Sequence, residues 1–250
     1  MGLLLIVLVA VSLGGCVGSR VRESSSMSLD EVFESARDSR VAPEKSPLVL
    51  PASVAILVVP GDGQVPETAL HQAAEKLKRQ LLENKKYISS ASIVSSREVS
   101  NKITLEQVRT NYGADVIILI FYHQDQRSEQ NSVAGLLDGV IIGHYMVPSV
   151  KVRATTLVEG VVAHIPNNAV IFRTSVLDES SSLSTSFSEE NVAAKVSVRS
   201  FKAAMENFGE SLTSTLDQFE HFDMSRAGSM ADLLESSGES GSAAAGDKPA

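Results

Sequence analysis

Short apolar runs alternate along the chain with stretches in which apolar and charged residues repeat at helical spacing. Residues 52–59 (ASVAILVV) are continuously apolar and end at a Pro-Gly-Asp-Gly sequence, a pattern typical of a strand buried on both faces and followed by a turn. Residues 65–86 place Leu and Ala on one side and charges on the other, which predicts an amphipathic helix. A second strand is expected over residues 88–96.

The most hydrophobic run beyond the amino-terminal segment, residues 114–122 (ADVIILIFY), predicts the central strand. A capping-box pattern at Thr104–Gln107 predicts a short helix before it, and Gly113 is expected to end that helix. The polar sequence HQDQRSEQN should bound the strand at its other end. This order of strand, helix, strand, helix, strand predicts a mixed or parallel sheet with helices packed on it.

The second half of the chain changes to the pattern of a hairpin. Residues 150–165 alternate, residues 166–168 can turn, and residues 169–177 return as a second strand. Residues 189–219 then show the spacing of a long amphipathic helix that could cover the sheet. We therefore expect one α/β domain, with α+β as the alternative: a single mixed sheet with a long carboxyl-terminal hairpin and flanking amphipathic helices.

The amino terminus has the pattern of a signal peptide. Residues 2–13 are almost entirely apolar, a run too short to span a bilayer, and small residues follow it directly. We expect residues 1–15 to be removed by cleavage between Gly15 and Cys16. No Lys or Arg precedes the apolar run, and the alternative is a buried strand or helix that contains an ordinary cysteine.

The rest of the chain divides into a tether, a folded unit and a tail. Residues 16–49 are rich in Ser, Arg and Glu, which predicts a flexible tether with one short helix at residues 29–36. Residues 50–222 form the expected globular α/β domain. Residues 223–250 are of low complexity and are expected to be disordered.

Composition and charge narrow the function. The 250 residues carry a net charge of −8, which repels phosphate backbones and argues against nucleic acid as a ligand. The single cysteine excludes an intrachain disulfide and any multi-cysteine metal site. No Trp is present, so aliphatic side chains must supply the core.

No catalytic or phosphate-binding motif occurs, so we expect a protein that is not an enzyme and that has no cofactor or bound metal. His123 with Asp125 at the end of the central strand is the strongest candidate for a metal or small-molecule site, against the alternative of a half-exposed strand-end histidine. The sequence at residues 61–63 favours a plain turn over a phosphate site. Asp115 is expected to be a cap or turn partner for Gly113.

Three further features leave alternatives open. Glu159 and Asp178 are expected to point to solvent from the hairpin. Residues 132–147 (SVAGLLDGVIIGHYMV) are apolar and punctuated by glycine. They are interpreted as a further strand or packed loop, or else as an element that binds a partner or forms an oligomer.

The sequence Leu13-Gly14-Gly15-Cys16 resembles the bacterial lipobox. The resemblance implies that Cys16 becomes the first residue of the mature protein and carries a diacylglyceryl thioether and an N-acyl chain. Three acyl chains hold a protein at a membrane far more firmly than one. Val17 stands where lipoproteins retained in the inner membrane often carry Asp, which favours the outer membrane, facing the periplasm.

The order of lipobox, tether, VAILVVP, helix, GADVIILI, hairpin and long terminal helix resembles the periplasmic α/β lipoproteins, including the curli-secretion and penicillin-binding-protein activator lipoproteins. More narrowly, GADVIILIFYHQDQ, VPSVKVRATTLVEGVV and the Ser/Ala-rich end are similar to the rhombotarget lipoproteins, over residues 50–220. That likeness implies association with a rhombosortase-type rhomboid protease. The chain ends in GSAAAGDKPA without an apolar helix, which departs from the usual substrates of such proteases.

Three functions follow as hypotheses. The first is a membrane-anchored, non-enzymatic binding or adaptor module of the cell envelope that has a protein partner. The second is an oligomeric export or pore component, as the curli-secretion resemblance implies, assembled through residues 132–147. The third is an envelope hydrolase whose site comes from dispersed residues.

Overall fold

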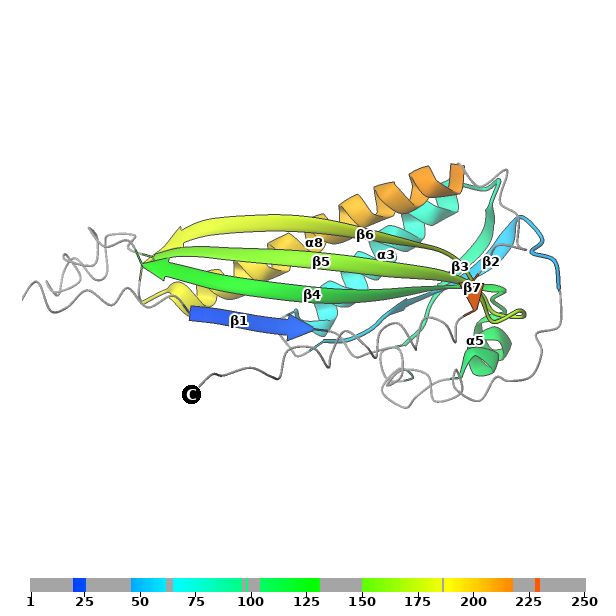
Figure 1. Ribbon diagram of the computed structural model, residues 1–250, viewed down its shortest axis with the longest axis horizontal. Coiled ribbons are helices and arrows are strands. Elements are labelled where there is room, and N and C mark those ends of the chain that lie inside the picture. Colours follow the sequence, from blue (N-terminus) through cyan, green and yellow to red (C-terminus); the bar gives the residue numbers. More distant parts are fainter. Residues whose placement is uncertain are drawn as a thin grey trace, which may run out of the picture.

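The computed structural model describes residues 20–25, 46–61, 65–95, 98, 104–130, 150–185, 187–217 and 228–229. Its strands are β1 (Arg20–Ser25), β2 (Ala52–Val58), β3 (Ile88–Ile93), β4 (Val116–Gln130), β5 (Val150–His164), β6 (Ala169–Ser184) and β7 (Gly228–Ser229). Its helices are α3 (Glu67–Glu83), α5 (Leu105–Tyr112) and α8 (Glu189–Asp217). Figure 1 shows how these elements are arranged.

All the strands belong to one mixed sheet in the order β3-β2-β4-β5-β6-β7, with β1 paired to β4. Strand β2 runs parallel to both β3 and β4, whereas β4, β5 and β6 are antiparallel neighbours. The long hairpin predicted from the sequence is β5 and β6. The expected fold class, α/β with a single mixed sheet, a carboxyl-terminal hairpin and flanking amphipathic helices, is confirmed.

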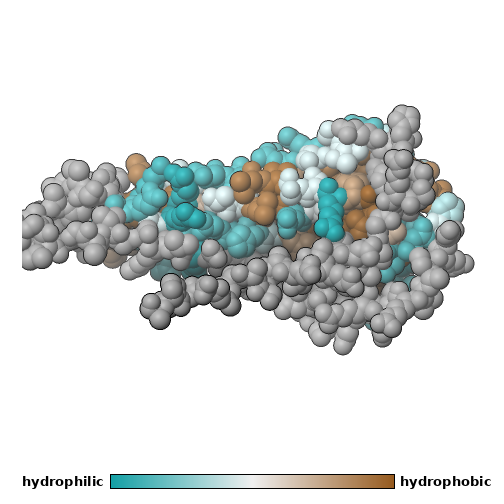
Figure 2. All heavy atoms as spheres, viewed as in Figure 1, coloured by the Kyte–Doolittle hydropathy of each residue, from teal (hydrophilic) through white to brown (hydrophobic). Residues whose placement is uncertain are grey.

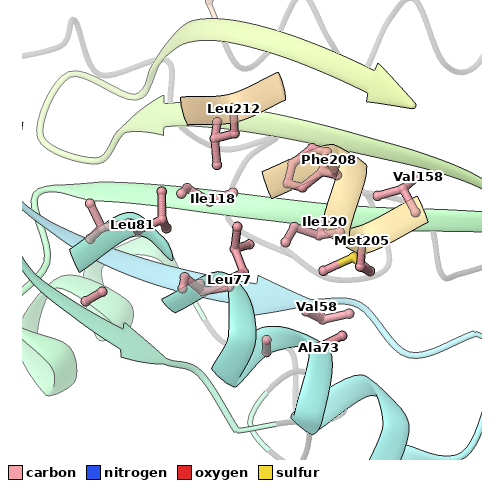
Figure 3. Close-up of a cluster of buried hydrophobic side chains, with 14 of the residues drawn as sticks. Val58, Ala73, Leu77, Leu81, Ile118, Ile120, Val158, Met205, Phe208 and Leu212 are labelled. Atoms are coloured by element: carbon pink, nitrogen blue, oxygen red, sulfur yellow. The ribbon is translucent and has the colours of Figure 1, made fainter. Parts of the chain in front are cut away.

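Helices pack on both faces of the sheet near its parallel strands. On one face, α3 and α8 bury the main apolar cluster, to which β2, β4 and both helices contribute (Figure 3). Phe208 of α8 lies so close to β5 that a Cβ at Gly160 would be 2.2 Å from its ring. On the other face, Val108 of α5 joins a second cluster with the opposite side chains of β2 and β4. This part of the molecule, called the core here, is therefore apolar on both sides of its sheet.

Local signals explain the helix ends. Thr104 and Gln107 form the predicted capping box, each side chain bonded to the backbone N–H of the other. Gly113 ends α5 in the left-handed conformation at φ 60°, which costs glycine little because it has no Cβ.

Two strands are longer than the sequence pattern predicted. β4 continues to Gln130 rather than ending at residue 122, and β6 continues to Ser184 rather than residue 177. In both extensions polar residues take the places of the expected apolar ones, and the strands persist because β5 pairs with them along its whole length.

These extensions build a projection from the core, which we call the arm: residues 123–130 of β4, 150–157 of β5 and 177–184 of β6, together with the first turns of α8 (Figure 1). Its far end, the tip, is the row formed by Gln130, Val150 and Ser184. The whole of β4, core and arm together, has 15 residues and spans about 50 Å.

Short parts of the predicted tether and tail also belong to the sheet. Within the tether, Arg20–Ser25 form β1 beside the arm, and within the tail, Gly228–Ser229 pair with the start of β6. Residues 46–49 of the tether are also described, and the backbone N–H of Ser46 donates to the side chain of Asn167. The helix predicted at residues 29–36 and the remaining residues of both segments lie outside the described residues.

Candidate interaction surface on the arm

The outer face of the arm, opposite α8, is formed by β4, β5 and β6, with β1 along the free edge of β4. Side chains alternate between the faces of a sheet, and those at odd-numbered positions point outward here. From the core to the tip, the rows are His123–Leu157–Leu177, Asp125–Thr155–Glu179, Arg127–Arg153–Ser181 and Glu129–Lys151–Leu183. Every charge on β4 and β5 within the arm lies on this face.

Opposite charges on the outer face are paired. The Nε of Arg127 lies 2.8 Å from a carboxylate oxygen of Asp125, and a guanidinium nitrogen of Arg153 lies 3.3 Å from Glu179. Exposed pairs of this kind contribute about 0–1 kcal/mol to stability. Their main consequence is a surface whose hydrogen-bonding groups are already oriented.

Two leucines interrupt this polar surface. Leu177 is 64% exposed and Leu183 is 65% exposed. Leu177 lies opposite Leu157 in the sheet, and His123 lies on the other side of Leu157. The arm thus presents an apolar contact next to charged rows, whereas hydrophilic side chains predominate over the rest of it in the view of Figure 2.

The inner face of the arm, beneath α8, contains a buried polar layer instead of a continuation of the apolar core. The apolar core ends at Tyr122, whose ring meets that of Phe201 edge-on at 5.1 Å between centroids. In the next row, the side-chain amide of Gln124 donates to the hydroxyl of Thr156 at 2.8 Å and to the carbonyl of Ser197 at 3.0 Å. Beyond this layer, a small apolar cluster around Val152 and Val196 resumes the packing.

The polar layer is incompletely satisfied. Within the described part of the chain, three of its buried atoms have no hydrogen-bond partner: Gln124 Oε1, Asp178 Oδ1 and Ser197 Oγ. A polar layer buries less apolar area than a hydrophobic one, so this layer holds α8 on the arm less tightly than an apolar layer would.

The position of Asp178 differs from the prediction. It was expected to point to solvent, but it lies at an even position of β6, on the inner face, where one carboxylate oxygen is buried. Burial raises the pKa of Asp178 above its ordinary value, and the charge of Glu179 raises it further. Glu159, by contrast, is exposed as predicted.

His123 and Asp125 do not close the central strand, because β4 continues beyond them to Gln130. Both lie on the outer face, in successive rows, and the carboxylate of Asp125 is bound to Arg127. In the described ranges no group of three or more His, Cys, Asp or Glu is placed to hold a metal ion. His123 and Asp125 therefore lie within a strand, and not at the strand end where the ligand site was expected.

A second polar group lies at the opposite end of the sheet. The hydroxyl of Ser53 is 2.6 Å from the carbonyl oxygen of Gly113 and 3.1 Å from a carboxylate oxygen of Asp115. Ser53, rather than Asp115, makes the contact to Gly113 that was expected. His164 is buried nearby, and burial lowers its pKa while the charge of Asp115 opposes that shift.

This second group bears on the hydrolase hypothesis. A hydrolase needs a nucleophile within hydrogen-bond reach of a base. Among the residues for which contacts are described, the hydroxyl of Ser53 is directed to Gly113 and Asp115, and no hydrogen bond joins it to His164. The arrangement ties the start of β2 to the start of β4.

Two hollows and one turn lie outside these two polar groups. A groove of about 260 Å³ runs between α3 and α8, where Lys76 bonds Glu206 and Lys202 bonds Gln72. A smaller apolar hollow lies beside Leu50 and Leu216. In the turn after β2, the backbone N–H of Gly61 donates to the hydroxyl of Tyr122. Residues 62–63 of the candidate phosphate turn lie outside the described residues.

Other sequence predictions also fall outside the described residues: Gly15, Cys16 and the apolar segment 132–147. The strand ends that flank the last of these, Gln130 and Val150, are paired at the tip of the arm. In the described part of the chain, no helix is both long and apolar enough to cross a membrane.

The sheet and its helices define a mixed α/β protein with a projecting three-stranded arm. No protein-family model and no curated protein matches the chain. Among solved structures, it is similar to the PelC dodecamer from Paraburkholderia phytofirmans, at 12% identity and a TM-score of 0.27, over 75% of this chain and 98% of that one. A variant of the same dodecamer gives 13% identity and a TM-score of 0.25, over 72% and 95%. At such TM-scores the likeness supports no inference about this chain.

Proposed function

We propose that the chain is a lipid-anchored lipoprotein of the bacterial cell envelope that binds a protein partner and catalyses no reaction. The observation that carries the binding role is the outer face of the arm, where exposed Leu177 and its neighbour Leu157 lie among oriented charges. Small-molecule sites are concave and enclose their ligands, whereas exposed sheet surfaces with a few apolar anchors suit proteins. The partner class that agrees with the sequence resemblance is a rhombosortase-type rhomboid protease system.

The shape of the arm supports this role. An arm adds exposed surface at the expense of buried area, and its inner layer contains unpaired polar atoms. Both features reduce folding stability, so the arm is best explained by a use that requires the projecting surface.

The anchor is the other half of the proposal. Acylation at Cys16 predicts that Cys16→Ala releases the protein from the membrane fraction of the envelope. Ser19→Ala, a nearby change that leaves the lipobox intact, is the matched control and should remain with the membranes. Equal membrane retention of the two variants would contradict the anchor.

The binding role is tested separately, on the anchored protein. Leu157→Ser combined with Leu177→Ser removes the apolar contact while leaving the sheet hydrogen bonds intact, so partner binding should fall and membrane attachment should not. Val49→Ser, which replaces a side chain that is 71% exposed and lies before β2, is the control for an apolar residue outside the arm. Loss of binding with the control and not with the arm variant would reject this face.

One observation favours the oligomeric export component as a second candidate. Strand β7 pairs with the outer edge of β6 at Ala169 and Val170, and no described strand pairs with that edge from Arg173 to Ser184. Open edges are templates for pairing with another chain. The size of the detergent-solubilised protein decides between the candidates: a monomer or dimer supports the adaptor, and a large ring supports the export component.

A further inference from the structure

The direction of β1 relates the anchor to the fold. β1 is antiparallel to β4, and its first residue, Arg20, lies opposite Ser128, two residues from the end of β4. Its last residue, Ser25, lies opposite His123, where the arm meets the core. The chain therefore enters the sheet at the tip of the arm and runs toward the core.

Cys16 precedes Arg20 by only four residues. Even fully extended, this piece of chain reaches about 14 Å, because each residue adds at most about 3.6 Å. The core end of the sheet is much farther away. Ser90 of β3 is level with the start of β2, which is level with the start of β4, and β4 spans about 50 Å from there to the tip.

We infer that the tip of the arm lies against the membrane surface, with the core held away from it and the outer face of the arm displayed beside the bilayer. This inference rests on the proposed function, because it takes Cys16 to be acylated. The surface in question is the lipid bilayer that receives the acyl chains. The pairing of β1 with β4 restricts the arm to an orientation that a free tether of 34 residues would not impose.

A second, independent feature agrees with this orientation. The strand ends Gln130 and Val150 are paired at the tip, and the sequence that joins them contains the apolar residues 132–147. The most apolar segment between two described strands is thus connected to the same end of the molecule as the anchor.

The orientation also restricts the partner. A surface held within a few tens of ångströms of the bilayer meets membrane-embedded proteins more readily than proteins free in the periplasm. The outer-face rows nearest the membrane are those of Arg127 and Lys151. This placement therefore favours a partner that is a membrane protein with a polar domain close to the bilayer.

Site-specific fluorescence quenching tests the orientation. Two conservative variants, Ser181→Cys in the arm and Ser90→Cys in the core, both at exposed positions, are labelled with a fluorophore. The full acylated chain is placed in vesicles of phosphatidylethanolamine and phosphatidylglycerol that carry a nitroxide on the lipid headgroup. We expect loss of most of the fluorescence at position 181 and none at position 90.

The same vesicles provide a second test through the linker. Insertion of about 20 Gly and Ser residues after Val17, with a mean reach of about 25 Å, should restore much of the fluorescence at position 181. If Ser181→Cys does not fold, Leu183→Cys is an independent position in the row next to the tip.

The outcomes separate the two proposals. A mass spectrum that shows unmodified Cys16 would overturn the proposed function and this inference with it. Acylated Cys16 with equal quenching at positions 181 and 90, or stronger quenching at position 90, would overturn the orientation alone and leave the anchor in place.

Discussion

Strands β4, β5 and β6 run through both the core and the arm, but their side chains are buried in different ways in the two regions. In the core, helices cover both faces of the sheet, and side chains such as Ile118 and Leu119 are buried on opposite sides of one strand. In the arm, α8 covers one face, over a layer that includes Gln124 and Thr156, and no described helix covers the other face. The comparison shows where stability resides and where surface is made available.

The difference has an energetic consequence. Apolar burial stabilises the fold by about 25 cal/mol per Å², and the arm offers little apolar area to bury. We therefore expect the core to carry most of the folding free energy and the arm to depend on it, since β4, β5, β6 and α8 are continuous between the two regions.

The largest effect should come from the core. Phe208→Ala removes a fully buried ring and leaves a cavity, so it should lower the free energy of unfolding by about 3–5 kcal/mol. Val158→Ala in the core and Val152→Ala in the arm are a matched pair, because each removes the same two carbon atoms from a fully buried side chain. Val152→Ala should cost about 1.5 kcal/mol, the value of two buried methylene groups, and Val158→Ala should cost more. Urea unfolding of the two valine variants measures the contrast, and equal losses would contradict it.

A more specific test concerns the close packing of β5 against α8. Gly160→Ala adds a methyl group that would lie 2.2 Å from the buried ring of Phe208, so overpacking should cost about 1–3 kcal/mol. Gly209→Ala is the control, because there the added Cβ meets mainly the side chain of Gln80, which can move. Thermal unfolding of the two variants measures the difference in stability. If Gly209→Ala lost as much stability as Gly160→Ala, the close contact with Phe208 would not be the cause.

The polar layer of the arm should respond to pH. Because the pKa of Asp178 is raised in the folded protein, folding binds a proton at pH values above the ordinary value of 3.8, and the stability of the wild type falls as the pH rises through the raised pKa. Asp178→Asn removes this cost and should be more stable at neutral pH by less than about 1 kcal/mol.

The sign of that effect is checked by repeating the unfolding measurement in acid. The advantage of Asp178→Asn should shrink as the pH falls and should be lost below 3.8, where the wild-type carboxyl group is protonated in the unfolded state as well as in the folded one. An advantage that stays constant between neutral and acid pH would mean that Asp178 is not titrating in this layer.

The smallest effect on stability belongs to the outer face. Leu177→Ser replaces a side chain that is 64% exposed, so the free energy of unfolding should change by no more than about 0.5 kcal/mol. A larger loss, measured by the same urea titration, would show that Leu177 serves packing within the arm and not an outside partner.

The sequence predicted the core well and the arm poorly, for one physical reason. Continuous apolar runs and helical spacing identified β2, α3, the first half of β4 and α8, because burial on both sides leaves that pattern. The stretch HQDQRSEQN was interpreted as a boundary because it contains no apolar residue. In the folded chain its even positions, Gln124, Gln126 and Ser128, are buried under α8 and its odd positions carry all the charges.

The polar layer shows what sequence reasoning missed and what signal was available. Alternation of uncharged and charged residues in residues 123–129 has the period of a strand, but it is not an alternation of apolar and polar residues. Asp178 was misplaced for the same reason, since the strand that carries it was expected to end one residue earlier. The pairing of β1 with β4 has no local signal, because it joins segments about 100 residues apart.

Photo-crosslinking in intact cells tests the central claim, that the outer face of the arm binds a protein partner of the cell envelope. A photoreactive phenylalanine analogue replaces Leu177 on the arm or, as the control, His71 on the exposed side of α3. The account predicts a discrete crosslinked product to an envelope protein from position 177 and none from position 71. The same products from both positions, or a product from position 71 alone, would contradict it.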